Sequence, residues 1–534
     1  MWAKARYALV TIVIMLMISS LMSTATEAIS PEDFEYEVKD DGTVEITGYN
    51  GEEVDLIIPE EIDGKLVTSI AEYAFYQLPL ESVTIPDGVE SIGDYAFYWC
   101  EELTSVIIGN GVTSIGEEAF SYCYSLTSVD IPDGVSYIGD YAFSDCHSLP
   151  SIDIPASVTS IGKGAFAWCP SLTSITVDPA NPDYIGVDGV LYNKDQTTLM
   201  QCPGGKSGEF TIPSGVTTIL DDAFGGCEFL TEITIPDTVT RIGDYAFSDC
   251  YSLTSIDIPA SVTYIGNGTF GWCPSLETID VDEENPNYAS IDGVLYTKDL
   301  TTLVQCPGGK SGEFTIPDSV TSIAMDAFAA CEFLTSIIIP ESVNSIGDWA
   351  FTECYNLTSI IIPDGVTLIG EATFSWCYSL GSVTLPNSVT SIGEAAFYEC
   401  HSLTNMTIPD SVTNIDGWAF SKCYNLTSVT VGKGVTSIGE YAFGSCESLS
   451  SIIFEGDAPE VGSGWIEGVS SELAIYYYEG ATGFDGPDWE GLPLQVISSP
   501  KGGFDDTSLA IVIAAITIAA VLVLVLFVLR SGRQ

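Results

Sequence analysis

Residues 123–145 read CYSLTSVDIPDGVSYIGDYAFSD, and variants of this stretch fill the chain from about residue 70 to about residue 455. Its clearest marker is Ala-Phe or Thr-Phe followed by Cys three residues after the Phe, found in fourteen copies, the first of which has Leu78 at the Cys position. Cysteines of neighbouring copies, such as Cys100 and Cys123, are 23 residues apart. A fixed period of this length is typical of a solenoid, in which each repeat buries its apolar side against its neighbours.

Within one repeat, the order of apolar and polar residues predicts a short strand followed by a turn. Val129 and Ile131 lie two residues apart, which places both side chains on one face of a strand. Pro132 and Gly134 then end that strand. Asp140 suits the first position of a short helical turn that carries Phe143 inward. We therefore expect a parallel β-sheet on one face of the solenoid and short helical turns on the other.

The pattern C-x-x-L-x-x-I-x-I-P-x-x-V-x-x-I-G-x-x-A-F resembles the BspA-like, or treponemal-type, leucine-rich repeat, and the resemblance covers most of the chain. It implies a leucine-rich-repeat solenoid with β-rich terminal caps. Members of that family are bacterial, archaeal and protist surface proteins, and several are adhesins. The resemblance therefore implies a noncatalytic surface role.

The segments outside the repeats predict export, two caps and a membrane anchor. A basic start, an apolar run and small residues are typical of a signal peptide, and 21 uncharged residues near the other end are enough to span a bilayer as a helix. The predicted order is a signal peptide at 1–28, an amino-terminal β cap at 31–70, the solenoid at 71–455, a carboxyl-terminal cap at 456–497, a linker at 498–508, a transmembrane helix at 509–529 and a cytoplasmic tail at 530–534. This order predicts a single-pass cell-membrane protein whose repeats are extracellular.

Two repeats are longer than the others. The interval from Cys169 to Cys227 is 58 residues, as is the interval from Cys273 to Cys331, so each long repeat holds 35 extra residues, at about 178–210 and about 282–314. The Asp-Gly turns in both insertions are typical of hairpins. The string Phe-Thr-Ile-Pro that ends each insertion is expected to restore a strand of the main sheet.

The charge of the chain excludes one class of partner. The sequence holds 74 acidic and 15 basic side chains, which gives a formal net charge of -59. Such a surface repels nucleic acids and anionic lipid headgroups and attracts cations and basic partners. We expect no nucleic-acid partner.

The cysteines and histidines do not indicate an enzyme. We call the cysteines at the repeated position three residues after the repeat Phe the ladder cysteines. Stacked repeats would point their thiols in parallel, which is poor geometry for disulfides, so buried free thiols are expected. His147 and His401 each follow a ladder cysteine, at a position that holds Tyr, Glu or Pro in other repeats. A catalytic pair needs a thiolate close to an oriented imidazole, and nearly every polar residue here belongs to the repeat consensus. We predict no catalytic site.

The sheet face is the binding surface that the sequence predicts. The residue between the two inward strand positions should point outward, and along the chain this position holds Thr84, Ile107, Asp130, Asp153, Thr176, Thr234, Asp257, Asp280, Ile338, Ile361, Thr384, Thr407, Thr430 and Ile453. Ile338 and Ile361 would form a modest apolar patch on adjacent rungs. Asp130 with Asp153, and Asp257 with Asp280, would place like charges side by side.

The sequence also indicates one candidate ligand, calcium, and one candidate modification, glycosylation. The aspartate pairs are candidate calcium ligands because calcium prefers carboxylate oxygens, although duplication of the repeat alone explains why they recur. No other cofactor is predicted. Asn267, Asn356, Asn405 and Asn425 begin N-x-[S/T] sequons, which export would expose to glycosylation, although Asn-Leu-Thr also arises from the repeat itself.

The sequence thus predicts a cell-surface adhesin or ligand-binding protein with an extracellular protein or glycan as its partner. The alternative is a structural component of the cell envelope that assembles through cations or self-association. Specific binding to cells would favour the first role, and ordered assembly with divalent cations would favour the second.

Overall fold

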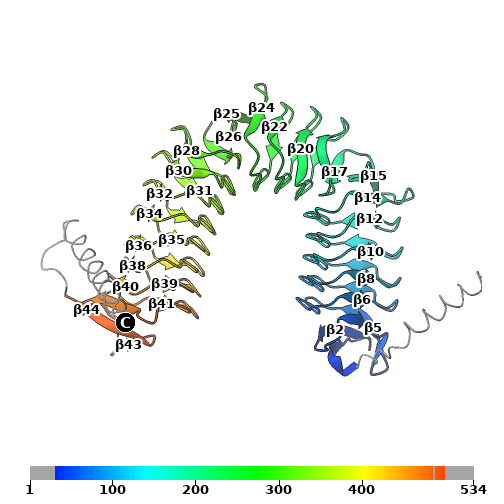
Figure 1. The fold of residues 1–534 in the computed structure, drawn as a ribbon, viewed down its shortest axis with the longest axis horizontal. Coiled ribbons are helices and arrows are strands. Elements are labelled where there is room, and N and C mark those ends of the chain that lie inside the picture. Colours follow the sequence, from blue (N-terminus) through cyan, green and yellow to red (C-terminus); the bar gives the residue numbers. More distant parts are fainter. Residues whose placement is uncertain (1–30, 485–487, 499–534) are drawn as a thin grey trace, which may run out of the picture.

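The protein, described by a computed structural model over residues 31–484 and 488–498, is a solenoid that curves into an arch (Figure 1). The predicted signal peptide, transmembrane helix and cytoplasmic tail lie outside the described residues, as does the predicted linker after residue 498. In the described part of the chain, no helix is long and apolar enough to cross a membrane. The one helical segment there is a 3-10 turn, η1 (Pro31–Asp33).

Most repeats contribute two short strands, separated by a turn that in most cases contains Pro. The first strand carries the apolar alternation seen in the sequence; these strands are β3 (Asp55–Ile57), β6 (Ser82–Thr84), β8 (Ser105–Ile107), β10 (Ser128–Asp130), β12 (Ser151–Ile154), β14 (Ser174–Val177), β18 (Ser207–Thr211), β20 (Phe229–Thr234), β22 (Ser255–Ile258), β24 (Thr278–Val281), β28 (Gly312–Thr315), β30 (Leu334–Ile338), β32 (Ser359–Ile361), β34 (Ser382–Thr384), β36 (Asn405–Ile408), β38 (Ser428–Val431) and β40 (Ser451–Phe454). The second strand has two residues; these strands are β7 (Ser91–Ile92), β9 (Ser114–Ile115), β11 (Tyr137–Ile138), β13 (Ser160–Ile161), β19 (Thr218–Ile219), β21 (Arg241–Ile242), β23 (Tyr264–Ile265), β29 (Ser322–Ile323), β31 (Ser345–Ile346), β33 (Leu368–Ile369), β35 (Ser391–Ile392), β37 (Asn414–Ile415), β39 (Ser437–Ile438) and β41 (Glu460–Val461).

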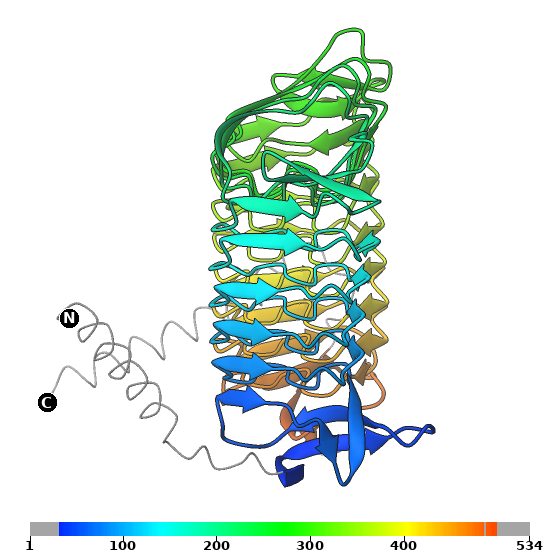
Figure 2. The same ribbon diagram turned by 90° about the vertical axis from the view of Figure 1, so that its right-hand side faces the viewer.

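Equivalent strands of neighbouring repeats pair in parallel and in register, as the fixed period requires. Val83 lies opposite Val106 in β6 and β8, and Ile92 lies opposite Ile115 in β7 and β9. The first strands do not form one continuous sheet, because hydrogen-bonded pairing is interrupted, for example between β10 and β12 and between β30 and β32. Figure 2 shows the stacked strands from the side.

The turns that carry Phe are not helical, and that part of the prediction was wrong. Tyr95 and Trp99, two residues before and two residues after Phe97, both have left-handed backbones (φ 56° and 62°), which no α-helix accommodates. Their repeat equivalents are mostly left-handed as well. The backbone N–H of Phe97 donates to the carbonyl of Ala119 in the next repeat, at 2.8 Å. The turns are therefore stacked by hydrogen bonds between repeats, which leaves these N–H groups unavailable to a helix.

We call the stack of these turns the turn wall; it comprises residues 71–78, 94–101, 117–124, 140–147, 163–170, 221–228, 244–251, 267–274, 325–332, 348–355, 371–378, 394–401, 417–424 and 440–447. Inside the wall, the repeat phenylalanines form a ladder of stacked rings. Phe97, Phe120 and Phe143 are fully buried, and their successive ring centroids are 5.0 and 5.3 Å apart. This ladder, with the ladder cysteines and the strand Leu, Val and Ile residues, forms the core of the solenoid.

Each insertion folds as a hairpin followed by one extra rung of strands. In the first insertion, β15 (Tyr184–Val187) and β16 (Val190–Asn193) are antiparallel, and β17 (Thr198–Gln201) pairs in parallel with β19. The second insertion repeats this arrangement in β25 (Tyr288–Ile291), β26 (Val294–Thr297) and β27 (Thr302–Gln305), which pairs with β29. The expected main-sheet strands are also present, since β18 pairs with β20 and β28 pairs with β30.

The insertions add no turn to the turn wall. The backbone N–H of Trp168, in the turn before the first insertion, donates directly to the carbonyl of Gly225, in the turn after it. The strand side of the solenoid therefore gains a rung that the turn wall lacks, and the molecule must bend toward the wall at both insertions. This wedge accounts for the curve of the arch, whose inner edge is the turn wall (Figure 1).

Both ends of the solenoid are closed by β structure. At the amino end, β1 (Phe34–Val38) and β2 (Val44–Tyr49) form an antiparallel hairpin, followed by β4 (Glu61–Ile62) and β5 (Lys65–Ile70), and β5 joins β2 to β7. At the carboxyl end, β42 (Ala474–Tyr478) continues the sheet from β40 to β44 (Leu492–Ile497), which pairs with β43 (Asp488–Trp489). These elements cover the strand edges that an open solenoid would expose.

Candidate functional site

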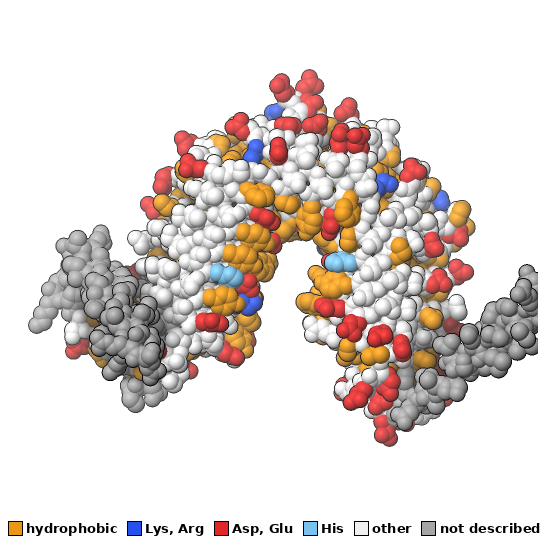
Figure 3. Space-filling model, in the orientation of Figure 1, with side chains coloured by type: hydrophobic (Ala, Val, Ile, Leu, Met, Phe, Trp, Pro, Cys, Tyr) orange, Lys and Arg blue, Asp and Glu red, His pale blue; other side chains and the backbone are white. Residues whose placement is uncertain are grey.

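The inner edge of the arch carries many aromatic side chains. Figure 3 shows hydrophobic and histidine side chains along this edge, with acidic groups among them. They come from turn-wall positions close to the buried Phe, where the local turn directs side chains out of the core. Serine, alanine or glycine occupies some of these positions in other repeats, so the fold itself does not require aromatic rings there.

Eight of these rings form a connected surface in the amino-terminal arm, which we call the aromatic patch: Tyr73, Tyr76, Tyr95, Tyr98, Trp99, Tyr122, Tyr124 and His147. Tyr73 stacks on Tyr95 with ring centroids 4.8 Å apart, and Trp99 stacks on Tyr122 at 5.5 Å. The side chains of Tyr73 and Trp99 are 49% and 37% exposed. The patch thus offers solvent a large, ordered aromatic surface.

A second ring ladder lies in the carboxyl-terminal arm, at the position after each ladder cysteine. Tyr355 stacks on Tyr378 at 5.1 Å, Tyr378 on His401 at 4.6 Å, and His401 packs on Tyr424 at 4.8 Å. Because equivalent positions of stacked repeats lie next to each other, rings at one repeat position form a column. The two arms therefore present aromatic columns on the inside of the arch.

Carboxyl groups lie on the turn wall together with the rings, and the pKa values of several of these groups are raised. Burial, with a contribution from nearby Asp249 and Glu118, raises the pKa of Asp145 to about 7. Burial also raises the pKa of Asp249 to about 6, although hydrogen bonds from Trp168 and Tyr251 oppose this shift. The pKa of Tyr95 is raised to about 12 by burial and by the charges of Glu118 and Glu117. The wall is therefore both aromatic and acidic.

Lys422 shows how side chains of the turn wall contact a cation. The ammonium of Lys422 donates a 2.7 Å hydrogen bond to Glu399 and lies 4.8 Å from the ring centroid of Tyr398. Glu399 is only 17% exposed at its side chain, and these contacts raise the pKa of Lys422. A ring and a carboxylate of the turn wall together form a site for an ammonium group.

The binding surface that the sequence predicts lies on the strand face, and its binding role stays a prediction. Ile338 and Ile361 are 46% and 70% exposed, but they belong to β30 and β32, between which no ladder of hydrogen bonds runs. Asp130 and Asp153 are exposed on β10 and β12, which are separated in the same way. Ile453, expected to point outward, is buried; it lies in register between Thr430 and Tyr476 of the flanking strands.

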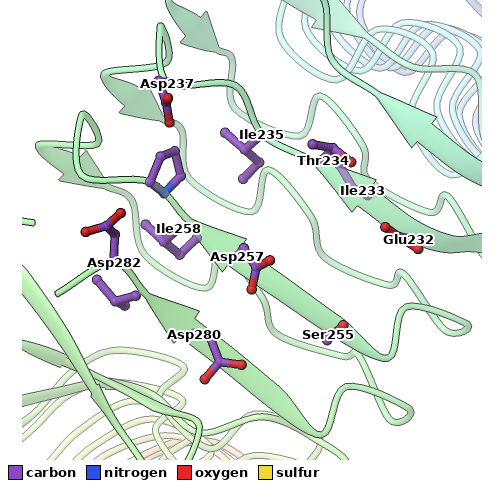
Figure 4. A pocket seen from close by; sticks show the side chains of 12 residues that line it. Glu232, Ile233, Thr234, Ile235, Asp237, Ser255, Asp257, Ile258, Asp280 and Asp282 are labelled. Atoms are coloured by element: carbon purple, nitrogen blue, oxygen red, sulfur yellow. The ribbon is translucent and has the colours of Figure 1, made fainter. Parts of the chain in front are cut away.

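Asp257 and Asp280 are the predicted aspartates that the structure pairs directly. They lie opposite each other on β22 and β24, on one face of the sheet (Figure 4). With Glu232, Asp237 and Asp282 they line a shallow hollow of about 580 Å³. Among the described residues, no three or more His, Cys, Asp or Glu side chains are placed to hold a metal ion. A calcium site on this face stays a prediction.

The cysteines serve the core. All fifteen are free and buried. The thiol of each ladder cysteine points toward a backbone carbonyl of the preceding repeat, as Cys123 does toward Phe97 at 3.4 Å, or of the insertion in the case of Cys227 and Cys331. Burial raises the pKa of Cys123 well above its usual value. The imidazole of His147, next to Cys146, is half exposed and packs on Tyr124, so thiol and ring lie on opposite sides of the backbone.

The four sequon asparagines are exposed, which is compatible with glycosylation but does not test it. Asn356 and Asn425 each donate from the side-chain amide to a carbonyl of the preceding repeat, Glu332 and His401 respectively. These two side chains therefore have a structural role between repeats.

The sequence contained a signal for the turn wall that the repeat consensus concealed. Aromatic residues occur one, two and four positions after the repeat Phe and two positions before it, but each position varies from repeat to repeat. A consensus records such a position as unspecified. Comparing one position across neighbouring repeats reveals columns, such as Tyr355, Tyr378, His401 and Tyr424.

Comparison with known proteins supports the repeat assignment. The family model of the BspA type leucine rich repeat region (6 copies) matches residues 68–188, 202–304, 308–423 and 369–477. No curated protein matches the chain.

Solved structures of bacterial leucine-rich repeat proteins are similar to it. A leucine rich cell surface protein from Faecalibacterium prausnitzii is 29% identical, covering 82% of this chain and 96% of that one, with a TM-score of 0.36. A leucine-rich repeat protein from Bacteroides ovatus is 27% identical, covering 79% and 93%, with a TM-score of 0.35. The leucine rich repeat protein of T. pallidum is 30% identical, covering 42% and 88%, with a TM-score of 0.31. The family model matches more than half of the sequence. The chain belongs to the BspA-type leucine-rich repeat family.

Proposed function

We propose that this chain is a noncatalytic cell-surface protein that binds an extracellular ligand through its turn wall. The observation that carries the proposal is the combination of aromatic columns and carboxylates on the inside of the arch. Tyrosine and tryptophan dominate the energetics of protein interfaces, whereas the outward positions of the strand face hold only Thr, Asp and Ile. The surface location is supported by the family.

The route to the surface follows from the two terminal segments. We propose that residues 1–28 direct export and that residues 509–529 anchor the chain as a single membrane-spanning helix. The repeats would then lie outside the cell, with the mouth of the arch accessible to a protein or glycan.

The test compares three forms of the full chain on arrays of extracellular proteins and glycans. The wall variant carries Tyr98→Ser and Tyr398→Ser, because neighbouring repeats hold Ser121 and Ser375 at that position and show that serine fits the turn. The strand-face variant carries Ile338→Asp and Ile361→Asp. We expect saturable binding by the wild type, loss in the wall variant and retention in the strand-face variant. Loss in the strand-face variant alone would move the site to the sheet.

A second role, as a structural envelope component, is favoured by the acidic hollow of the strand face. Asp257 and Asp280 lie side by side there, and a cation bridging two molecules would relieve their repulsion. Light scattering with calcium tests this role. Growth in particle size that Asp257→Asn and Asp280→Asn abolish, without ligand binding on the arrays, would favour assembly over adhesion.

A further inference from the structure

We infer that the aromatic patch of the amino-terminal arm binds a basic polypeptide segment, whose arginine or lysine side chains sit between its rings and carboxylates. This inference rests on the proposed function and names the chemistry of its partner. Three features of the patch support it: its rings, its carboxylates and the absence of lysine and arginine from this part of the sequence.

The rings are not required by packing. Tyr76 and Tyr98 occupy the position after the repeat Phe, where other repeats hold Ala167, Gly225 or Ser248. Trp99 occupies a position that holds Gln77 in the preceding repeat. The same turn therefore also accommodates small or polar residues. The rings are therefore free to serve a contact surface rather than the core.

Carboxylates lie among these rings. Glu101 accepts a hydrogen bond from the indole of Trp99 at 2.5 Å. The charge of Glu118 is close enough to raise the pKa of both Tyr95 and Tyr98. Glu118 is itself half buried, and its own pKa is raised by burial and by Glu117. An approaching cation would relieve this repulsion.

The chain supplies no cation of its own here. Between Lys65 and Lys163 the sequence contains no lysine or arginine, while thirteen acidic residues lie between residues 71 and 150. Where the chain does place a basic residue on the turn wall, it uses this same chemistry. Lys422 pairs with Glu399 over the ring of Tyr398, and Lys163 lies 5.4 Å from the ring centroid of Tyr141. The amino-terminal arm has the rings and carboxylates of such a site and lacks the cation.

A basic polypeptide supplies that missing component. Arginine and lysine both bind carboxylates and aromatic faces, and several of them along one segment could contact successive rungs. A neutral glycan would stack on the rings and donate hydroxyl hydrogen bonds to the carboxylates, but it would leave their negative charge without a counter-charge. A nucleic acid would be repelled by them.

The test measures binding of a fluorescent ten-residue peptide of alternating arginine and glycine to the full chain by anisotropy. A peptide of alternating serine and glycine controls for nonspecific contact with the rings. The charge variant is Glu101→Gln with Glu118→Gln. Its matched control, Asp257→Asn with Asp280→Asn, also removes two negative charges, but from the strand face. The ring variant, Tyr98→Ser with Trp99→Gln, leaves the net charge unchanged.

We expect the charge variant and the ring variant each to bind the arginine peptide about tenfold more weakly, as loss of interface anchors does. The strand-face control should remain within about twofold of wild type, since exposed charges far from a contact are largely screened. Equal weakening by the charge variant and its control would show bulk attraction to an acidic protein and overturn the inference. Unchanged binding by the ring variant, equal binding of the serine peptide or no binding of the arginine peptide would also overturn it.

The proposed function can survive that failure. If the wall variant loses a ligand found on the arrays while the arginine peptide shows only bulk attraction, the turn wall is the binding surface and its partner is not basic. If no wall variant weakens either interaction, both proposals are contradicted.

Discussion

The indole Nε1 of Trp168 donates a 2.8 Å hydrogen bond to Oδ2 of Asp249, 81 residues further along the chain. This contact crosses the whole first insertion. Trp168 also lies against Gly226, whose equivalent at the second insertion is Ala330. Trp272 makes the same kind of bond to Glu353 across the second insertion, at 2.9 Å. Together these bonds join the turns before and after each insertion, where the strand side of the solenoid has an extra rung. They therefore stabilise the bend of the arch.

Gly226→Ala should weaken this closure. Gly226 has φ +71°, and an added Cβ would lie 2.6 Å from the Cα of Trp168, so the turns at the first insertion must shift, as the second insertion does to accommodate Ala330 at the equivalent position. We expect a loss of stability greater than the ~1–2 kcal/mol that a left-handed alanine costs, together with a larger maximum dimension by small-angle X-ray scattering.

Gly208→Ala is the matched control. Gly208 is also left-handed, at φ +78°, but nothing lies within 4 Å of its added Cβ. We expect only the backbone cost of ~1–2 kcal/mol and an unchanged scattering profile. Equal effects of the two substitutions would show that contact across the insertion does not set the bend.

Stability should fall as the pH rises from about 4 to about 7. Burial raises the pKa of Asp145 to about 7 and the pKa values of Asp222, Asp249 and Asp326 to about 6. Over this range the folded chain holds protons that the unfolded chain releases, so the stabilisation is complete below the unfolded pKa and is lost as the pH passes the folded pKa. Self-repulsion of the acidic surface acts in the same direction.

The melting temperature at pH 5 and pH 8 measures this effect. We expect a higher value at pH 5, and a smaller difference between the two in Asp249→Asn, whose amide oxygen still accepts from Trp168. Asp133→Asn, at an exposed turn position, controls for the loss of one charge and should leave the difference unchanged. A higher melting temperature at pH 8 in the wild type would contradict the assignment of these buried carboxyl groups.

Removing one ring from the phenylalanine ladder should be costly. Phe120 is fully buried between Phe97 and Phe143, so Phe120→Ala leaves a cavity and is expected to cost about 3–5 kcal/mol. Hydrogen exchange should show the loss in residues 94–147 first, because each repeat contacts only its neighbours. Phe229→Ala, at a side chain that is 45% exposed, should cost far less. Uniform loss of protection along the solenoid would argue against this local coupling.

The thiols should be inert in the folded protein. All fifteen cysteines are buried, and burial raises the pKa of Cys100 and Cys446 to about 12. Because the thiolate is the reactive form, Ellman's reagent should titrate almost no thiols in the native state and fifteen after denaturation without a reductant. A lower count after denaturation would indicate disulfides.

The repeat period was sufficient to predict the solenoid, because a 23-residue unit with fixed apolar positions can bury them only by stacking. It could not predict the turns. The string Gly-Asp-Tyr-Ala-Phe suggested a helical start, and the left-handed backbone of Tyr95 and Trp99 is set by hydrogen bonds to the next repeat, which no single repeat encodes.

The curvature and the turn wall also depend on contacts between repeats. Whether an insertion adds a rung to one side or to both depends on Trp168 meeting Gly225, residues on either side of the insertion. The outward direction of Asp257 and Asp280 followed from strand alternation and agrees with the structure. The aromatic patch lies at variable turn positions, where alternation gives no direction, so its exposure could be seen only in three dimensions.

The most direct test of the turn wall as the contact surface is carboxyl footprinting of the full chain with the strongest array ligand. Carbodiimide labelling, read by mass spectrometry, compares each carboxyl group in the free and bound states. We predict protection at Glu101, Glu118 and Glu399 on the wall and unchanged labelling at Asp257 and Asp280 on the strand face. Protection confined to Asp257 and Asp280 would contradict the account and place the ligand on the sheet.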